Sequence, residues 1–184
     1  MEKQFLTSDR LYLRALADTD LEGPYVEWLN DAEVCRHNSH HVFPYTVEAA
    51  GAYVAACRNS RSALVLAICS RQDDRHLGNI ALQRIDPVAG SAEYAILLGD
   101  RTCWGQGFAK EASALIVRHG FLEMNLRRIA CGTSVDNLAM QRLAAYMGMR
   151  EEGRRRQALF KHGRYADVIE YGLLRDECPP EFLA

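Results

Sequence analysis

Long apolar runs are missing from this sequence. No stretch of its 184 residues approaches the roughly 20 consecutive apolar residues that a transmembrane helix needs. The chain opens with Met-Glu-Lys-Gln, which lacks the apolar region of a secretion signal. These two absences predict a cytoplasmic protein with no membrane-spanning segment and no membrane partner.

Paired cysteines and long basic runs are missing as well. The 6 cysteines show no Cys-x-x-Cys spacing, which favours reduced thiols over a zinc site or a disulfide framework. The formal net charge of −2 and the pI near 6.3 argue against a nucleic-acid partner held by phosphate contacts. Dense basic charge is confined to Arg154–Arg156, next to Glu151 and Glu152, which favours a solvated hairpin edge.

The most informative segment that is present runs from Ser91 to Ala112. An apolar strand leads into the loop Trp104-Gly105-Gln106-Gly107-Phe108-Ala109-Lys110, after which a helix is predicted to begin at once. Glycines let the backbone approach an anion, and several backbone N–H groups would lie at the positive end of the helix dipole. This pattern favours a phosphate or pyrophosphate ligand. The loop alone leaves open the alternative of a bare glycine turn that caps a helix.

Two familiar phosphate motifs do not fit this loop. The nucleotide P-loop requires Ser or Thr after its lysine, whereas Lys110 is followed by Glu111. The dinucleotide fingerprint requires a third glycine, whose place is taken here by Ala109 and Lys110. Two predicted strands joined by short turns precede the loop, which favours an antiparallel meander over an opening βαβ unit. A different class of phosphate-bearing ligand is therefore indicated.

The run AEYAILLGDRTCWGQGFAKEA resembles the acetyl-CoA-binding motif of the GNAT superfamily of N-acetyltransferases, and within it the branch of the ribosomal-protein N-acetyltransferases. Further segments resemble other motifs of the family in the same order: Tyr25–Asp31 with Glu33 and Val34, His76–Ile80, Asn137–Met149 and Gly163–Asp167. The resemblance extends over about residues 8–176. It implies an acetyl-CoA-dependent N-acetyltransferase.

The fold implied by this resemblance is a single domain of mixed α/β (α+β) class. We expect a central twisted mixed sheet of about seven strands flanked by about four helices. Residues 1–176 would form the N-acetyltransferase domain and residues 177–184 a short C-terminal tail. Periodicity and turn residues predict strands at 10–15, 63–69, 77–85, 92–98 and 128–135, helices at 18–31, 46–58, 108–122 and 137–147, and two C-terminal strands around Phe160 and at 168–174.

The resemblance also implies the residues that bind acetyl-CoA. Its pyrophosphate is expected on the segment Trp104, Gly105, Gln106, Gly107, Phe108, Ala109 and Lys110. Asn137 is expected to contact the pantetheine amides, and a simple helix N-cap is its compatible alternative role. Backbone N–H groups of Leu97 and Leu98 are expected at the thioester oxygen, because this strand bulges in the family. No metal is expected.

Glu93 is the candidate general base. It is a lone acid among Ala92, Tyr94 and Ala95 on the strand that leads to the cofactor loop. An amine must be neutral to attack a thioester, and a base within reach lowers the cost of removing its proton. The open alternative is a carboxylate that merely pairs with a neighbouring strand.

The proton donor to the departing thiolate is left open by the sequence. Many relatives carry a tyrosine or a serine in the helix that follows the asparagine, where this chain has Ala144 and Met140. Either the thiolate leaves unassisted, or Cys131, Tyr171 or water supplies the proton.

The acceptor is predicted to be a primary amine. The segments EWLNDAEV and HLGNIAL resemble the relatives that act on amino sugars, which favours a small molecule such as an amino-sugar nucleotide. The alternatives are a peptide N-terminus and, from another class of protein, a non-catalytic acyl-CoA-binding module. Residues 15–35 contain acids but no Lys or Arg, which suits either a cationic acceptor or a solvated helix face. A monomer and a homodimer are both compatible with the sequence.

Overall fold

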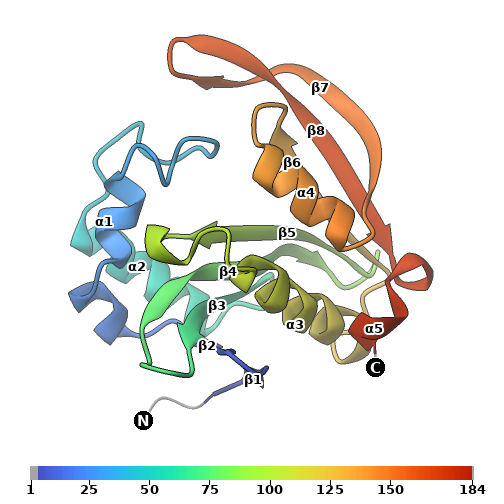
Figure 1. Cartoon of the computed structure of the whole chain (residues 1–184), viewed down its shortest axis with the longest axis horizontal. Coiled ribbons are helices and arrows are strands. Elements are labelled where there is room, and N and C mark those ends of the chain that lie inside the picture. Colours follow the sequence, from blue (N-terminus) through green and yellow to red (C-terminus); the bar gives the residue numbers. More distant parts are fainter. Residues whose placement is uncertain (1–3, 184) are drawn as a thin grey trace.

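The computed structural model describes residues 4–183 and contains a single eight-stranded mixed sheet (Figure 1). The order of strands across the sheet is β1-β2-β3-β4-β5-β6-β8-β7. The strands are β1 (Leu6–Thr7), β2 (Leu11–Ala15), β3 (Ala63–Ser70), β4 (His76–Asp86), β5 (Ser91–Leu98), β6 (Arg128–Ser134), β7 (Arg150–Lys161) and β8 (Arg164–Leu174). The α-helices are α1 (Tyr25–Asn30), α2 (Val47–Arg58), α3 (Phe108–Leu122), α4 (Leu138–Tyr146) and α5 (Pro180–Leu183).

The sheet contains one parallel pair, β5 and β6, and it is the place where the sheet opens. Helix α3 connects these two strands, as a parallel crossover requires. Their pairing extends from Ser91–Arg128 to Glu93–Ala130 and then stops, although both strands continue. Every other neighbouring pair is antiparallel. The distal halves of β5 and β6 therefore face each other across a split without a shared ladder.

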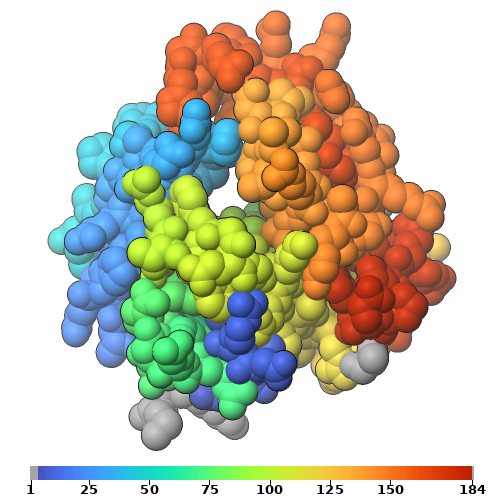
Figure 2. Space-filling view, in the orientation of Figure 1, coloured from blue at the N-terminus to red at the C-terminus, as the bar shows by residue number. Residues whose placement is uncertain are grey.

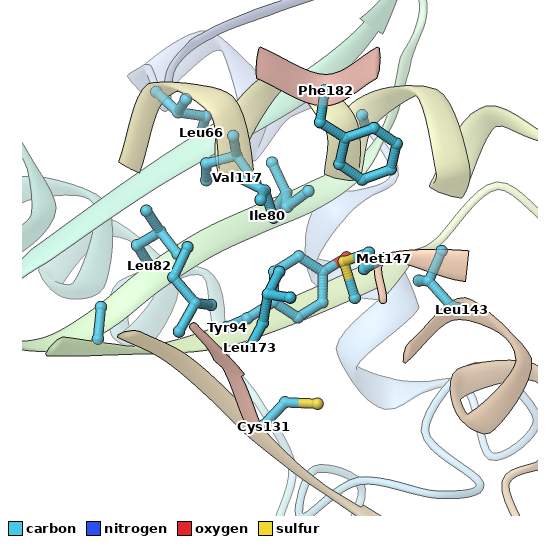
Figure 3. Packing of buried hydrophobic residues seen from close by; sticks show 14 of the residues in the cluster. Leu66, Ile80, Leu82, Tyr94, Val117, Cys131, Leu143, Met147, Leu173 and Phe182 are labelled. Carbon is cyan, nitrogen blue, oxygen red and sulfur yellow. The ribbon is translucent and has the colours of Figure 1, made fainter. Parts of the chain in front are cut away.

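The two faces of the sheet are covered to different extents. On one face, α3, α4 and α5 pack over the larger core, in which Ile116, Phe121, Ile129 and Leu173 are completely buried. Figure 3 shows Val117, Leu143 and Phe182 of these helices on the same side as Tyr94 of β5. On the other face, a smaller core joins α1 and α2 to β2, β3 and β4. Helices α1 and α2 do not extend over all of the sheet, so part of β5, β6 and β8 is uncovered on this face.

The predicted helix at 18–31 is wrong in one respect, because the structure divides it. A 3-10 helix, η1 (Asp18–Glu22), ends at Gly23, and α1 begins only after Pro24. Proline has no backbone N–H and disfavours helical conformation in the residue before it, so Gly23-Pro24 interrupts the helix. The helix predicted at 46–58 is confirmed with its cap, since the Thr46 hydroxyl accepts a hydrogen bond from Ala49 N–H at 3.2 Å.

The C-terminal segment predicted as a tail contains structure of its own. Residues 175–177 form a short 3-10 helix, η3, and α5 follows it. Cys178 and Phe182 are buried in the larger core. Residues 1–3 and 184 of the two predicted segments lie outside the described residues. The sheet also has one strand more than predicted, the short β1.

The state of the cysteines and the length of the helices can be compared with the sequence-based expectations. All 6 cysteines lie among the described residues, and each is a free thiol there. Of the helices between residues 4 and 183, none has the length and apolar character needed to cross a bilayer.

Candidate acetyl-transfer site

The loop before α3 has the backbone conformation that its two glycines permit. Gly105 and Gly107 have φ angles of +74° and +84°, in the left-handed region that disfavours residues with a side chain. Gly107 is the N-cap of α3, and no side chain caps this helix. A Cβ added at Gly105 would have no neighbouring atom within 4 Å, so the space beside the loop is open.

The N-terminal end of α3 presents a group of unused donors. Within the described chain, no hydrogen bond involves the backbone N–H groups of Gly105, Gly107, Phe108, Ala109 or Lys110. The first N–H groups of a helix have no partner within the helix, and they carry the positive end of its dipole. These residues therefore fit an anionic group such as the pyrophosphate of acetyl-CoA.

Arg10 holds this loop from a distant part of the chain, and the sequence patterns did not single it out. Its guanidinium donates to the Gln106 carbonyl at 3.0 Å and to Glu111 of α3 at 2.7 Å, and it lies 4.6 Å from the centre of the Phe108 ring. Burial opposes ionisation of Glu111, but hydrogen bonds from Ser8 and Arg10 outweigh it and lower the pKa of the carboxyl. The contact joins residues about 100 positions apart, so no local pattern indicates it.

The backbone of β5 offers donors to the split. Gly99 donates its N–H to the Leu77 carbonyl at 3.0 Å. Because donors alternate along an antiparallel strand, the N–H of Leu97 is directed toward β4, and those of Ile96 and Leu98 toward β6. The register between β4 and β5 is regular from Gln83–Glu93 to Gly78–Leu98. Immediately after this register the Leu77 carbonyl accepts from both the Gly99 and the Asp100 N–H groups, at 3.0 Å each, which is the hydrogen-bond pattern of a bulge two residues beyond Leu97. The N–H groups of Leu98 and Ile96 are therefore the candidate donors to the thioester oxygen, whereas the N–H of Leu97 belongs to the ladder with β4.

Glu93 lies at the point where the split begins. It belongs to the last residue pair that β5 and β6 share. Its carboxylate accepts a hydrogen bond from Gln83 at 3.3 Å and pairs with Arg84 at 2.9 Å. The Glu93 side chain is one-third exposed, whereas that of Arg84 is 81% exposed and free to leave. Glu93 thus pairs with residues of the neighbouring strand β4, which is the alternative role that we gave it, and its carboxylate is also accessible to solvent.

Tyr94 faces away from Glu93, as strand alternation predicted. Its hydroxyl forms a 2.6 Å hydrogen bond with Ser113 of α3, and burial raises its pKa. It is therefore held in the core and does not line the acceptor side.

A surface pocket of about 550 Å³ opens beside Glu93, at the end of the split where β5 and β6 are still paired. Its floor is formed by β5 and β6, and its wall includes Glu170 of β8 and Arg155 of β7. Three arginines and two glutamates share this space, together with small residues of the two strands: Arg84, Arg128, Arg155, Glu93, Glu170, Ser91, Ala92, Ala130, Cys131 and Gly132. The pocket thus offers charges of both signs next to the candidate base.

Asn137 is placed at the start of α4, where its side-chain oxygen accepts a hydrogen bond from Met140 N–H at 3.1 Å. This is the N-cap role that we gave as the compatible alternative. Ala144 is completely buried. Tyr146 lies elsewhere on α4, beneath the Lys110 ammonium at 4.7 Å from its ring centre and beside Phe182. Burial raises the pKa of Cys131 to about 12, so this thiol stays protonated at neutral pH.

The loop between α1 and α2 meets the β7–β8 hairpin above the split. The Lys161 ammonium contacts the His40 carbonyl there. Figure 2 shows an opening below this contact, bounded by the yellow-green segment before α3 and by the orange α4 region. Among the described residues, no group of His, Cys, Asp or Glu has the arrangement of a metal site.

The acidic segment before α1 is partly structural. Asp20 is buried and forms two hydrogen bonds with the Arg14 guanidinium, at 2.9 and 2.6 Å. The His76 ring nitrogen Nδ1 lies 3.2 Å from the same carboxylate. Burial opposes the charge of Asp20, but the hydrogen bonds from Arg14, together with the adjacent His76 ring and the Ala17 N–H, outweigh it and hold its pKa well below the usual range. One of the acids that could have attracted a cationic acceptor is therefore committed to the core.

Comparison with known proteins agrees with this geometry. The family model of the acetyltransferase (GNAT) domain matches residues 10–150. The uncharacterized N-acetyltransferase p20 of Bacillus licheniformis is 29% identical to the chain over 94% of it and 97% of p20. Two solved structures share the fold. Spermidine N-acetyltransferase from Vibrio cholerae, in complex with CoA and spermine, has a TM-score of 0.83 at 23% identity, covering 95% of this chain and 98% of that one. RimJ of Mycobacterium smegmatis has a TM-score of 0.81 at 18% identity, covering 92% and 84%.

The chain therefore belongs to the GNAT family of acetyltransferases, and the family predicted from its motifs is confirmed. It is an acetyl-CoA-dependent N-acetyltransferase.

Proposed function

We propose that this enzyme transfers the acetyl group directly to the primary amine of a small molecule that also carries an anionic group, such as an amino-sugar nucleotide. The observation that supports this acceptor most strongly is the composition of the pocket beside Glu93, where three arginines accompany two glutamates. A phosphate or carboxylate on the acceptor would find guanidinium partners there, while its amine lies near a carboxylate.

On the cofactor side, the backbone of Gly105–Lys110 binds the pyrophosphate of acetyl-CoA. The unused N–H groups at the start of α3 supply the hydrogen bonds, and the helix dipole favours the negative charge. Trp104 donates its ring N–H to the Leu98 carbonyl at 2.9 Å, which joins this loop to the end of β5. Asn137 at the start of α4 contacts the pantetheine. The thioester then lies in the split between β5 and β6.

On the acceptor side, Glu93 removes the proton that the amine must lose. A free primary amine has a pKa near 10.4, so deprotonation at pH 7 costs about 4–5 kcal/mol without a base. The neutral nitrogen attacks the thioester carbon, the new C–N bond forms, and the C–S bond breaks to release CoA thiolate. The nitrogen gives its second proton to water. Backbone N–H groups of Leu98 and Ile96 stabilise the negative charge on the carbonyl oxygen. The thiolate takes its proton from water, because Ala144 offers no donor and Tyr146 lies beside Lys110.

Net charge separates this acceptor from a polyamine. Spermidine is cationic along its whole length. Each of the three guanidinium groups of the Glu93 pocket is paired with a glutamate, so an ammonium group that takes one of these glutamates leaves an arginine that repels the rest of the polyamine. A second pocket, of about 680 Å³, lies between α1 and the start of β4. It is lined by five acids and three arginines, which leaves an excess of negative charge: Asp20, Glu27, Asp31, Asp74, Asp100, Arg14, Arg75 and Arg101. That acidic surface, together with the fold shared with a spermidine N-acetyltransferase, makes a polyamine the second candidate acceptor.

A panel of acceptors tests the proposal. Release of CoA thiol is measured with UDP-glucosamine, glucosamine, spermidine and a serine-initiated tetrapeptide, which represents the peptide N-terminus. We expect UDP-glucosamine to exceed glucosamine in kcat/KM by at least about tenfold, a difference of 1.4 kcal/mol from the anionic group. If the enzyme prefers spermidine or the peptide, the proposed acceptor class is wrong. If it turns over none of these amines, a non-catalytic acyl-CoA-binding module is favoured.

Arg155 and Arg156 provide a matched pair of variants for the same panel. Arg155 lines the Glu93 pocket, whereas its neighbour Arg156 does not and is also exposed. We expect Arg155→Gln to lower kcat/KM for UDP-glucosamine but not for glucosamine, and Arg156→Gln to change neither value. Equal effects of the two substitutions would show that general surface charge, and not the pocket, selects the acceptor.

A further inference from the structure

Glu170 of β8 reaches toward the split across a residue that has no side chain. The register between β6 and β8 pairs Glu170 with Gly132, two positions beyond the last pair shared by β5 and β6. A Cβ added to Gly132 would lie 3.1 Å from each carboxylate oxygen of Glu170. The carboxylate therefore lies over the backbone of β6, in space that any other residue at position 132 would fill. Gly132 is the feature that lets Glu170 extend toward β5.

Glu170 and Glu93 approach the same space from opposite sides. Both line the 550 Å³ pocket, Glu93 from β5 and Glu170 from β8, with Ala130 and Gly132 of β6 between them. Both carboxylates also act on one buried group, since after burial itself the charges of Glu170 and Glu93 contribute to the raised pKa of the Cys131 thiol. The two acids thus belong to one site, although 77 positions separate them in the chain.

The partner of Glu170 can be displaced easily. Its carboxylate pairs with Arg155, whose side chain is 63% exposed. Arg155 also adjoins an irregular part of β7, where the register with β8 shifts between Arg155 and Leu159. Exposed ion pairs of this kind contribute little to stability, because water competes for both charges. Glu170 can therefore exchange Arg155 for a cationic or hydroxyl group of a ligand, as Glu93 can exchange Arg84.

We propose that Glu170 is a second acceptor-binding carboxylate, which holds the acceptor amine opposite Glu93 and so determines that the ligand of this pocket must carry an amine. Glu170 binds the ammonium form on arrival, and Glu93 then takes the proton that is lost before attack. This inference rests on the proposed function in one respect, the position of the amine at Glu93. It goes further by assigning amine recognition to a residue on another strand.

The test is a binding experiment that needs no turnover. Two sugar phosphates, glucosamine 6-phosphate and glucose 6-phosphate, are titrated into the CoA-bound enzyme and followed by the NMR signals of the Gly132 and Ala130 amides. The two probes differ only in an amine that replaces a hydroxyl. We expect the wild type to bind the amine at least fivefold more tightly, and Glu170→Gln to lose that preference while binding glucose 6-phosphate as before.

Two further variants keep the test decisive. Glu151→Gln removes a carboxylate from β7 that pairs with Arg154 and does not line the pocket, so it should behave as the wild type. Gly132→Ala should reproduce the loss seen with Glu170→Gln, because the added Cβ displaces the carboxylate. The proposal is overturned if the wild type does not prefer the amine, or if Glu170→Gln retains that preference in a folded protein.

Kinetics with the best amine of the acceptor panel separate this inference from the proposed function. Glu170→Gln should raise the acceptor KM about tenfold and change kcat less than threefold, with the KM of acetyl-CoA unchanged. If Glu170→Gln turns over its acceptor with normal kinetic constants, the role of Glu170 is refuted and the proposed function is not affected. An enzyme inactive with every amine would refute the proposed function, and the binding preference would still be measurable.

Discussion

The two sides of the β5–β6 split present different kinds of group to their ligands, backbone N–H groups on one side and charged side chains on the other. On the cofactor side, one continuous segment, residues 104–110, offers backbone N–H groups whose direction is set by two glycines and the start of α3. On the acceptor side, the charged groups are side chains, and they come from β4, β5, β6, β7 and β8. The cofactor side is therefore a rigid binding site for one ligand. The acceptor side can change its ligand by exchanging side chains, while the sheet that carries them remains the same.

This difference has a physical basis. Backbone donors at a helix terminus are fixed by the fold, so a substitution there acts through backbone conformation or added charge. The acceptor side uses exposed ion pairs such as Arg84–Glu93, which can open without disturbing the sheet. We therefore expect substitutions on the two sides to separate cleanly into effects on acetyl-CoA binding and effects on turnover.

The largest expected effect is that of Glu93→Gln. Glutamine keeps the size of the side chain but cannot accept a proton at neutral pH, so turnover at pH 7 should fall by about 10²- to 10⁴-fold. Because more of the amine is already neutral at higher pH, the deficit should shrink as the pH rises. The measurement is the pH dependence of CoA release for the variant and the wild type. A deficit that is the same at every pH would indicate a structural role for Glu93.

A second expected effect concerns the scaffold of the acceptor side. Asp20→Asn removes the carboxylate that Arg14 and His76 share, and it leaves a buried guanidinium without its ionic partner. We expect a loss of about 3–5 kcal/mol in the free energy of unfolding at pH 7. Urea denaturation of both proteins measures it.

The pH dependence of that loss follows from the lowered pKa of Asp20. A carboxyl whose folded pKa is depressed stabilises the protein above its unfolded pKa, near 3.9, and loses this contribution as the pH falls toward the folded value. The stability difference between Asp20→Asn and the wild type should therefore be constant near neutrality and shrink below about pH 4. A difference that grows in acid would contradict the assignment.

The smallest of the three effects belongs to the cofactor side. Gly107→Asp adds a Cβ at a φ of +84° and a negative charge where the pyrophosphate should bind. Affinity for acetyl-CoA should fall more than tenfold, or more than about 1.4 kcal/mol, in a protein that still folds. Gly153→Asp is a matched control, because Gly153 lies on exposed β7 and a Cβ there would have no neighbour within 4 Å. If both variants bind acetyl-CoA equally well, the phosphate assignment is wrong.

The sequence predicted the parts of the fold that depend on local patterns. The core strands, α2 with its Thr46 cap and the start of α3 all followed from periodicity, capping residues and glycines. It failed where local signals compete, as at Gly23-Pro24, where a proline outweighs helical spacing. At β5 the resemblance implied a bulge, and the doubled hydrogen bond to the Leu77 carbonyl lies at Gly99 and Asp100, just after Leu98.

The acceptor side was predictable only in part. Glu93 stands out as a lone acid in an apolar strand, and that pattern is visible in the sequence. Glu170, Arg84 and Arg155 acquire meaning only when the sheet brings their strands together. Arg10 likewise reaches Gln106 across 96 positions. A single sequence carries no signal for such contacts, because they depend on strand order and register.

The most direct test of the division between the two sides is calorimetric titration of acetyl-CoA into Gly107→Asp and Glu93→Gln, with the wild type as reference. We predict that Gly107→Asp binds more than tenfold more weakly, and that Glu93→Gln binds with the affinity of the wild type although its turnover at pH 7 is reduced by at least about 100-fold. Unchanged binding in folded Gly107→Asp, or weakened binding in Glu93→Gln, would contradict the assignment of backbone to the cofactor and side chains to the acceptor.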